Sequence, residues 1–485
     1  MREHAGDAGL QQSAALDEVL EMKIHRGWGN RLTVLVVVLM LGACLDSEIE
    51  ARAQNSSDPS LPGPVLQLKL RNAIEIGLEN NFDLILARER IEEARGVAFT
   101  RLGALLPNLS GDANYTNRKV FQGQFGGQDA VSPSRDIHDL RGRLTQSIFN
   151  WGLIQQWRAG KTGVEATDLD AEGVRRDIMA TIALLYFEAI RGEEGVLAGE
   201  ANVKLNKELW DMAEGRKSAG AATGLDVVRA RVQYQIERQR LLDTVIERNK
   251  ARLNLIRAMG IRNDTKVIFR DALQLVDVQP QTPEEAIKVA LDNRVELKAQ
   301  DRRRLETQLR LDAVKGERIP SLDLRGDYGL IGETFDERFG NYTVGAYLTI
   351  PLFDGGQREG RIQESNSQLR QQMIRTKNLI HQVTIEARDA LLTLETAREQ
   401  VLVSTEALQL ALKELTLSRK AFAVGTITHL EIINAQTSVA GSRDRMIEAL
   451  FNFNAARVAL ARSQGRMELL YQEHAMNAKS TKVGF

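Results

Sequence analysis

The sequence predicts a mainly α-helical chain that also contributes strands to a transmembrane β-barrel. Three observations predict this fold class: long stretches without proline, an internal repeat, and four segments in which polar and apolar residues alternate. The chain has 485 residues, and its 27% of charged residues balance to a net charge of -1. Because a nucleic-acid partner would require a basic surface, this balance argues against one.

The first part of the chain has the form of a secretory signal peptide. An apolar run from Leu32 to Leu45 follows basic residues and ends in small ones. This run is too short for a membrane-spanning helix, which needs about 20 residues. We therefore expect residues 1–53 to be leader and 54–67 to be a linker, with Met22 as an alternative start.

Two cleavage sites compete within this leader. Leu41-Gly42-Ala43-Cys44 resembles a lipobox, which would place a lipid anchor on Cys44, whereas Ala51-Arg52-Ala53 fits ordinary cleavage before Gln54. We favour the lipobox because an acidic stretch at residues 46–50 would be unusual at a cleavage site. Since Cys44 is the one cysteine, a disulfide framework is excluded.

Two proline-free stretches, residues 134–279 and 352–485, predict long helices. Proline costs about 3 kcal/mol inside a helix, so its absence from stretches rich in Ala, Leu, Glu and Arg favours helix. We expect long helices at 151–214 and 356–418, and returning helices at 224–259 and 428–463. A helix of about 60 residues extends about 90 Å and needs partner helices along its whole length.

The two halves of the chain repeat one another, which divides it into a first repeat at 68–279, a second at 280–465 and a tail at 466–485. The matched blocks are Ala73–Asn80 with Ala286–Asn293, Leu106–Leu109 with Ile319–Leu322, Ile148–Gly152 with Leu352–Gly356, and Gly220–Ala230 with Gly425–Ala435. Four blocks in the same order indicate duplication, and each repeat is expected to be helix, two strands, long helix, turn and returning helix.

The alternating segments lie at about 108–119, 138–149, 321–331 and 341–352. Each has about the length of a tilted membrane-spanning strand, although a half-buried sheet in a soluble domain would alternate in the same way. Four strands leave open edges, which lipid does not tolerate. Eight strands from two copies would fill their own interior, whereas twelve from three copies leave a pore, so we expect a closed trimer.

The order of elements and two motifs resemble the TolC-like outer-membrane efflux protein family from about Leu68 to Gly465. The motifs are Thr349–Gly356, and Val424–Thr426 followed by Leu430–Gln436. The resemblance implies a homotrimer with a 12-stranded β-barrel in outer-membrane lipid and a 12-helix α-barrel in the periplasm. It also implies a belt around the helices, from residues near 260–285 and the tail, and two partners, a periplasmic adaptor and an inner-membrane pump.

The same resemblance points to the turns after the two long helices. Gly220 and Gly425 allow the left-handed backbone that such turns need. In the family the tip docks the adaptor, and this role carries over to Val424, Gly425 and Thr426, and by the repeat to Ala219, Gly220 and Ala221.

A pore constriction is expected just past these turns. By resemblance, Glu431 of each copy would form an electronegative ring, while Asn434 stands where the best-known members have an acidic residue. Asp226 occupies the position of a link that holds the helices shut. Phe422 and Ile427 stand where its partners would be, so we expect apolar packing or other polar pairs to hold the closed state.

The sequence contains no motif for catalysis or for a cofactor. Its six histidines lack metal-ligand spacing such as HExxH, and no nucleophile elbow or P-loop is present. We therefore expect an efflux channel of the outer membrane and not an enzyme. Two alternatives stay open: an outlet for type I protein secretion, and a periplasmic coiled-coil adaptor or structural protein.

Overall fold

The computed structural model describes residues 65–468 and 470, except 126, 127 and 335. The predicted leader, its cleavage sites, Cys44 and most of the linker and tail lie outside the described residues. Within the described residues, none of the helices combines the length and apolar character needed to cross a membrane.

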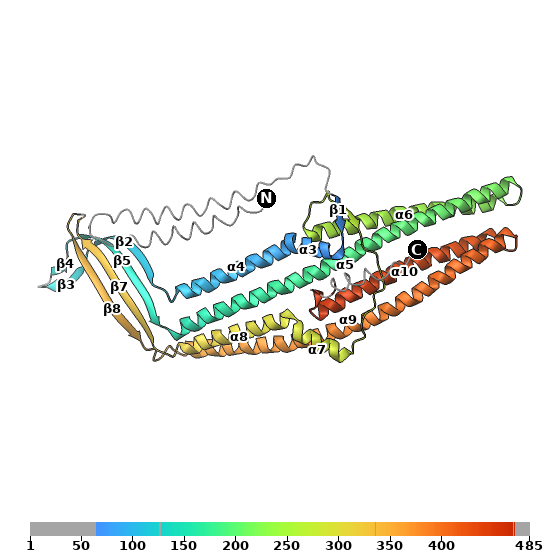
Figure 1. Cartoon of the computed structure of the whole chain (residues 1–485). Helices are drawn as coiled ribbons and strands as arrows, with labels where there is room; N and C mark the ends of the chain where they lie inside the picture. The colour runs from blue at the N-terminus through green and yellow to red at the C-terminus, as the bar shows by residue number, and fades with distance from the viewer. Residues whose placement is uncertain (1–64, 126–127, 335, 469, 471–485) are drawn as a thin grey trace, which may run out of the picture. The chain divides into compact units, whose positions relative to one another are not determined.

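Eight helices and eight strands make up the described part of the chain (Figure 1). The helices are α3 (Leu70–Asn80), α4 (Phe82–Gly103), α5 (Trp151–Ser218), α6 (Gly224–Met259), α7 (Pro283–Asn293), α8 (Val295–Gly316), α9 (Gln357–Ala423) and α10 (His429–Ser463). The strands are β1 (Val65–Leu68), β2 (Asn108–Arg118), β3 (Phe121–Phe125), β4 (Gln128–Val131), β5 (Arg135–Phe149), β6 (Lys266–Phe269), β7 (Ser321–Gly332) and β8 (Arg338–Thr349).

The long helices α5 and α9 have 68 and 67 residues, and each begins beside an Asx residue at the same place in its repeat. The Asn150 side chain accepts a hydrogen bond from the Leu153 N–H at 3.1 Å, and Asp354 Oδ2 accepts one from the Arg358 N–H at 2.9 Å. These bonds satisfy backbone donors that have no partner within the first turn of a helix.

Each repeat opens with two helices, where the sequence suggested one. The break lies at Asn81 between α3 and α4, and at Arg294 between α7 and α8, and both residues have extended backbone. Asn81 accepts from the Asp83 and Leu84 N–H groups and donates to the Ala258 carbonyl at 2.8 Å. Asn81 therefore connects the start of α4 to the end of α6.

The helices pack in a fixed order. Helices α4 and α6 pack against α5, α5 packs in turn against α8 and α10, and both of these pack against α9 (Figure 1). This order leaves α4 and α6 at one edge of the helical layer and α9 at the other.

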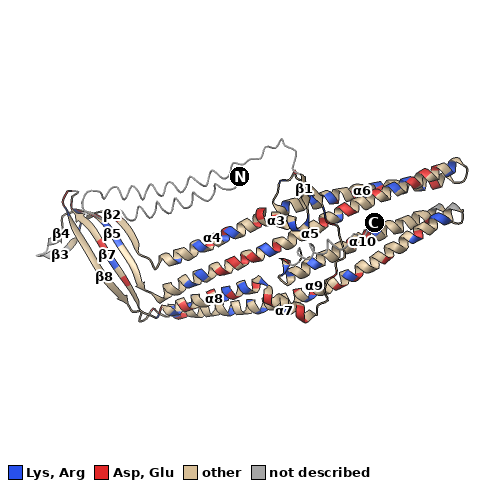
Figure 2. Cartoon of the chain, viewed as in Figure 1, with Lys and Arg blue, Asp and Glu red and all other residues tan. Residues whose placement is uncertain are grey.

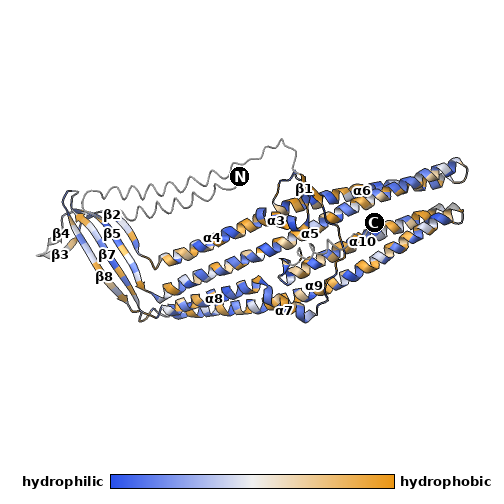
Figure 3. Ribbon diagram, in the orientation of Figure 1, coloured by the Kyte–Doolittle hydropathy of each residue, from blue (hydrophilic) through white to orange (hydrophobic). Residues whose placement is uncertain are grey.

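The two strand pairs join into one antiparallel sheet in the order β2-β5-β7-β8. Leu140 of β5 is paired with Leu330 of β7, so the apolar positions of both repeats fall on one face. The other face carries charge, and Arg141 Nη1 lies 2.6 Å from Asp327 Oδ1 across the same strand pair. The alternation is visible in the hydropathy colours of the strands (Figure 3), and the charged residues of β5 and β7 appear in Figure 2.

The apolar face of this sheet is exposed rather than covered by helices. Its exposed members include Leu109, Tyr115, Leu140, Ile148, Tyr328, Tyr342, Val344 and Leu348. A sheet of a soluble domain would bury such a face, so the half-buried sheet considered from the sequence does not describe this one.

The segment between β2 and β5, where no strand was predicted, contains a second hairpin. Strands β3 and β4 pair antiparallel there, with Phe125 opposite Gln128. Glycines in this segment interrupt the alternation of polar and apolar residues, so the strands could not be predicted from the sequence.

The largest core cluster lies around the middle of α5, where the short parallel pair β1–β6 covers it. The buried Tyr186 hydroxyl donates to Asp271 Oδ2 at 2.8 Å, and the same oxygen accepts from the Leu70 N–H at 2.9 Å. Burial, together with the Asp271 charge, raises the pKa of Tyr186, so this residue stays a neutral donor. The contact holds the start of α3 against α5.

Arg294 anchors the break in the second repeat. Its side chain is only 9% exposed and pairs with Glu296 at 2.9 Å and with Glu386 of α9. Burial raises the pKa of Glu386, but the hydrogen bonds from Arg294 and Gln382 outweigh it and lower that pKa below its usual value. This contribution to stability is therefore present at neutral pH and is lost as the pH falls through the lowered pKa.

We predict that Arg294→Met lowers the free energy of unfolding by about 2 kcal/mol. The change leaves the carboxylates of Glu296 and Glu386 without their cationic partner, although both are still partly hydrated. Denaturant unfolding of the detergent-solubilised protein at pH 7 measures this change. Arg71→Met, which removes an exposed pair with Glu75, is the matched control and should have little effect. Equal effects of the two changes would contradict the role given to Arg294.

Candidate functional site at the helical tips

The turns that end α5 and α9 have the same backbone structure and lie at the same end of the helical layer (Figure 1). Gly220 and Gly425 have φ of 71° and 80°, the left-handed region that glycine favours. The Ala221 N–H donates to the Arg216 carbonyl at 2.8 Å, and the Thr426 N–H donates to the Ala421 carbonyl at 3.0 Å. Both long helices thus end in the same glycine-dependent turn.

Both returning helices begin with a Thr-x-x-acid capping box. Asp226 Oδ2 accepts from the Thr223 N–H at 3.0 Å, and Glu431 Oε2 accepts from the Thr428 N–H at 2.7 Å. The two acidic residues singled out from the sequence are therefore equivalent in the repeat, and each stabilises the first turn of its helix. This second role was not predicted, although the Thr-x-x-acid spacing signals it.

The residues expected at the adaptor-docking tips are on the surface. Val424, Gly425, Thr426, Ala219, Gly220 and Ala221 are all exposed. These side chains are small or apolar, so the surface they form suits packing against another protein better than binding a charged ligand. Glu431 and Asn434 are also exposed and lie one turn apart on α10, whereas Asp226 is half-buried.

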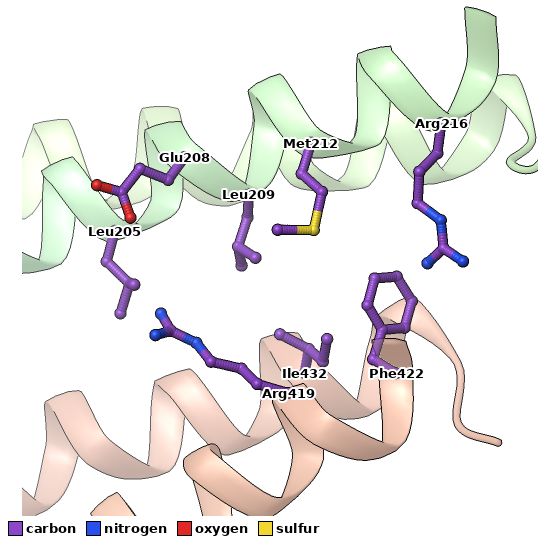
Figure 4. Close-up of a pocket in the computed structure, with 8 residues that line it drawn as sticks. All are labelled: Leu205, Glu208, Leu209, Met212, Arg216, Arg419, Phe422 and Ile432. Atoms are coloured by element: carbon purple, nitrogen blue, oxygen red, sulfur yellow. The ribbon is translucent and has the colours of Figure 1, made fainter. Parts of the chain in front are cut away.

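A groove of about 420 Å³ separates the two hairpins near these turns (Figure 4). Leu205, Leu209 and Met212 of α5 face Ile432 of α10, and Glu208, Arg216, Arg419 and Phe422 complete the lining.

One contact crosses this groove near the turns. The Arg216 guanidinium lies over the Phe422 ring, 4.1 Å from its centroid, and so connects α5 to α9 by a cation–π interaction. Phe422 is one of the two residues that stand where the partners of Asp226 were expected. The role of Arg216 could not be predicted from the sequence, because the two residues are far apart in the chain.

The described residues of this region do not form a group of metal ligands. Among the residues that the structure describes, no three His, Cys, Asp or Glu side chains are grouped as metal ligands. The arrangement positions apolar and charged side chains around the groove between the two hairpins.

A family model described as outer membrane efflux protein matches residues 73–261 and 286–466, one segment in each repeat. The chain is 21% identical to the pyoverdine export outer membrane protein OpmQ of Pseudomonas putida over 82% of this chain and 86% of that protein. It is 22% identical to the outer membrane protein TolC of Escherichia coli over 76% and 74%.

Solved structures share the fold. The CmeC outer membrane channel of Campylobacter jejuni aligns with a TM-score of 0.72 at 16% identity, over 85% of this chain and 90% of that one. At this identity the likeness shows that the arrangement of strands and helices is the same.

We predict that Thr223→Ala destabilises the first turn of α6 by about 1 kcal/mol, because its hydroxyl no longer accepts from the Asp226 N–H. Hydrogen exchange of the amides at 224–228 measures this change. The matched control is Thr244→Ala, which removes a hydroxyl bonded to the Arg240 carbonyl within the same helix and should leave these amides unchanged. Unchanged protection in Thr223→Ala would count against the capping box.

Proposed function

Because the chain belongs to the outer membrane efflux protein family, we propose that three copies of it form a tunnel through which solutes leave the cell. The family predicted from the sequence motifs is confirmed, since the match covers both repeats. The family is one of transport proteins, and export through a tunnel makes and breaks no bond, so we assign the chain no catalytic residue and no cofactor.

The observation that carries the proposal is the sheet of four strands. Within the described residues, β2 and β8 are each paired on one side only, and the apolar face is exposed. Unpaired backbone groups at these edges cost several kcal/mol each in lipid, so β8 of one copy pairs with β2 of the next. Three copies supply twelve strands, with the apolar face in the outer-membrane lipid and the charged face toward the pore.

The helices continue the same arrangement into the periplasm. One edge of the helical layer is formed by α4 and α6 and the other by α9. The edge strands of the sheet, β2 and β8, belong to the same two ends of the protomer: β2 to the first repeat and β8 to the second. A head-to-tail ring closes both layers by one rotation.

In this ring, Glu431 lines the narrowest part of the pore. Three copies of an exposed carboxylate on α10, with the neutral Asn434 beside it, would favour cations. The exposed tips around Val424, Gly425 and Thr426, and around Ala219, Gly220 and Ala221, receive the periplasmic adaptor, which connects the tunnel to an inner-membrane pump. Their position suits this role, because they are exposed at the ends of the two hairpins.

The assembly predicts that the protein is extracted from the outer membrane with detergent and migrates as a trimer when it is not boiled. The trimer should also form ion-conducting channels in planar bilayers. Mass photometry of the extract and single-channel recording measure both properties. A monomer in the soluble fraction would overturn the proposal.

We predict that Glu431→Gln lowers the permeability of the channel to cations relative to anions. Glutamine at this position still accepts from the Thr428 N–H, so the start of α10 is kept while the charge is removed. Reversal potentials in a salt gradient measure the ratio. The control is Glu92→Gln, an exposed change on α4, which should leave the ratio unchanged; an unchanged ratio in Glu431→Gln would exclude it from the constriction.

We predict that Phe422→Ala raises single-channel conductance more than Asp226→Ala does. Phe422 connects α5 to α9 through Arg216, a contact worth up to about 2 kcal/mol, whereas Asp226 caps its own helix. Recording from each variant at the same voltage measures the difference. A large opening in Asp226→Ala with none in Phe422→Ala would show that Asp226 holds the closed state.

A further inference from the structure

The two repeats are equivalent residue by residue around the tips. An offset of 205 residues relates Gly220 to Gly425 and, at the far ends of α6 and α10, Gly260 to Gly465, and all four glycines have positive φ. The capping threonines Thr223 and Thr428 obey the same offset. Helix α9 is therefore the equivalent of α5, and α10 the equivalent of α6, with a known register.

Near the tips, α5 of the first repeat packs against the α9–α10 hairpin of the second. Leu205 packs against the buried cluster of Ala411, Leu415, Ala435 and Val439, and nearer the tip Leu209 lines the same groove as Ile432. Gln436 follows Ile432 by one turn on the same face of α10, so this register brings it beside Leu209. Leu209 and Gln436 are each only 4% exposed.

In a ring of copies, the same contact recurs between α9 of one copy and α6 of the next. With this offset of 205 positions, the α5 residues Leu205 and Met212 correspond to Leu410 and Leu417 of α9. These two leucines are 59% and 56% exposed, seven residues apart on one face of the helix. Leu205 and Met212 line the groove between the repeats, so an exposed apolar face in the same register on α9 is the surface expected for a second copy of this chain.

At the centre of this surface the repeats differ in charge. The offset relates Leu209 to Glu414 of α9 and Gln436 to Arg231 of α6, and both charged residues are exposed. The Arg231 guanidinium lies over the Trp210 ring, 5.4 Å from its centroid, which orients it at the α5–α6 surface. Charged residues along α6 and α9 appear in Figure 2.

We infer that Glu414 of one copy forms an ion pair with Arg231 of the next copy, an inference that rests on the proposed trimer. At the equivalent positions within the protomer stand the uncharged Leu209 and Gln436. A charge pair at this place also fixes the register of neighbouring copies, because shifting α9 by one turn would bring an apolar residue opposite Arg231.

Charge reversal tests the pair in the full-length protein. Glu414→Arg and Arg231→Glu should each lower the fraction of trimer that survives heating in detergent by about tenfold, because like charges then face each other at every interface. The double variant should restore most of that fraction. Unboiled gels and mass photometry after a temperature series measure it.

The matched control pair is Glu406→Arg with Arg229→Glu. By the same offset these positions correspond to Ala201 and Asn434, both of which are exposed in the protomer, so neither faces a neighbouring helix. Each single control and their combination should leave the heat resistance of the trimer unchanged. A loss as large in the controls as in the test variants would overturn the inference.

A second experiment does not depend on trimer stability. A short thiol-specific cross-linker should join Glu414→Cys/Arg231→Cys copies into dimers and trimers, whereas Glu406→Cys/Arg229→Cys and the wild type, whose one cysteine is Cys44, should stay uncrosslinked. A stable conducting trimer without charge-reversal rescue or this cross-link would reject the ion pair while leaving the tunnel intact. Absence of any wild-type trimer would instead reject the proposed function.

Discussion

The open edges of the protomer are the constraint on which the rest of the structure depends. Strands β2 and β8 end the sheet, and α4 with α6 and α9 end the helical layer, at matching positions in chain order. Neither layer closes on itself within the described residues of one chain. In the proposed trimer, the exposed apolar residues of the sheet become buried in lipid and those of α9 against a neighbouring copy.

Duplication explains why one small set of local signals builds both halves. The Asx residues at the starts of α5 and α9, the glycine turns at their ends and the Thr-x-x-acid boxes of α6 and α10 recur in order. These signals depend on residues within a few positions of one another and therefore survive divergence of the helical faces between them. Those faces differ near the tips, where Leu209 corresponds to Glu414 and Gln436 to Arg231.

Much of the fold could be predicted from the sequence, because long proline-free helices and alternating strands leave strong periodic signals. The breaks at Asn81 and Arg294 could not, since neither residue type is a helix breaker and the extended backbone is held by contacts with α6 and α9. The β3–β4 hairpin was hidden by its glycines. At the site, the turns and acidic residues were visible as motifs, whereas the Arg216–Phe422 contact depends on how two distant hairpins pack.

In the proposed tunnel Glu431 has two roles, and together they limit which residues can replace it during evolution. Its carboxylate holds the first turn of α10 through the Thr428 N–H, and in the proposed tunnel it also supplies charge where the pore is narrowest. Replacement by most neutral residues would loosen the helix start as well as alter ion preference, and glutamine alone among the neutral side chains keeps the length and the acceptor. Few replacements of Glu431 could therefore change ion selectivity without loosening the start of the helix. Asn434 does not cap the helix, so its charge can change without disturbing the hairpin.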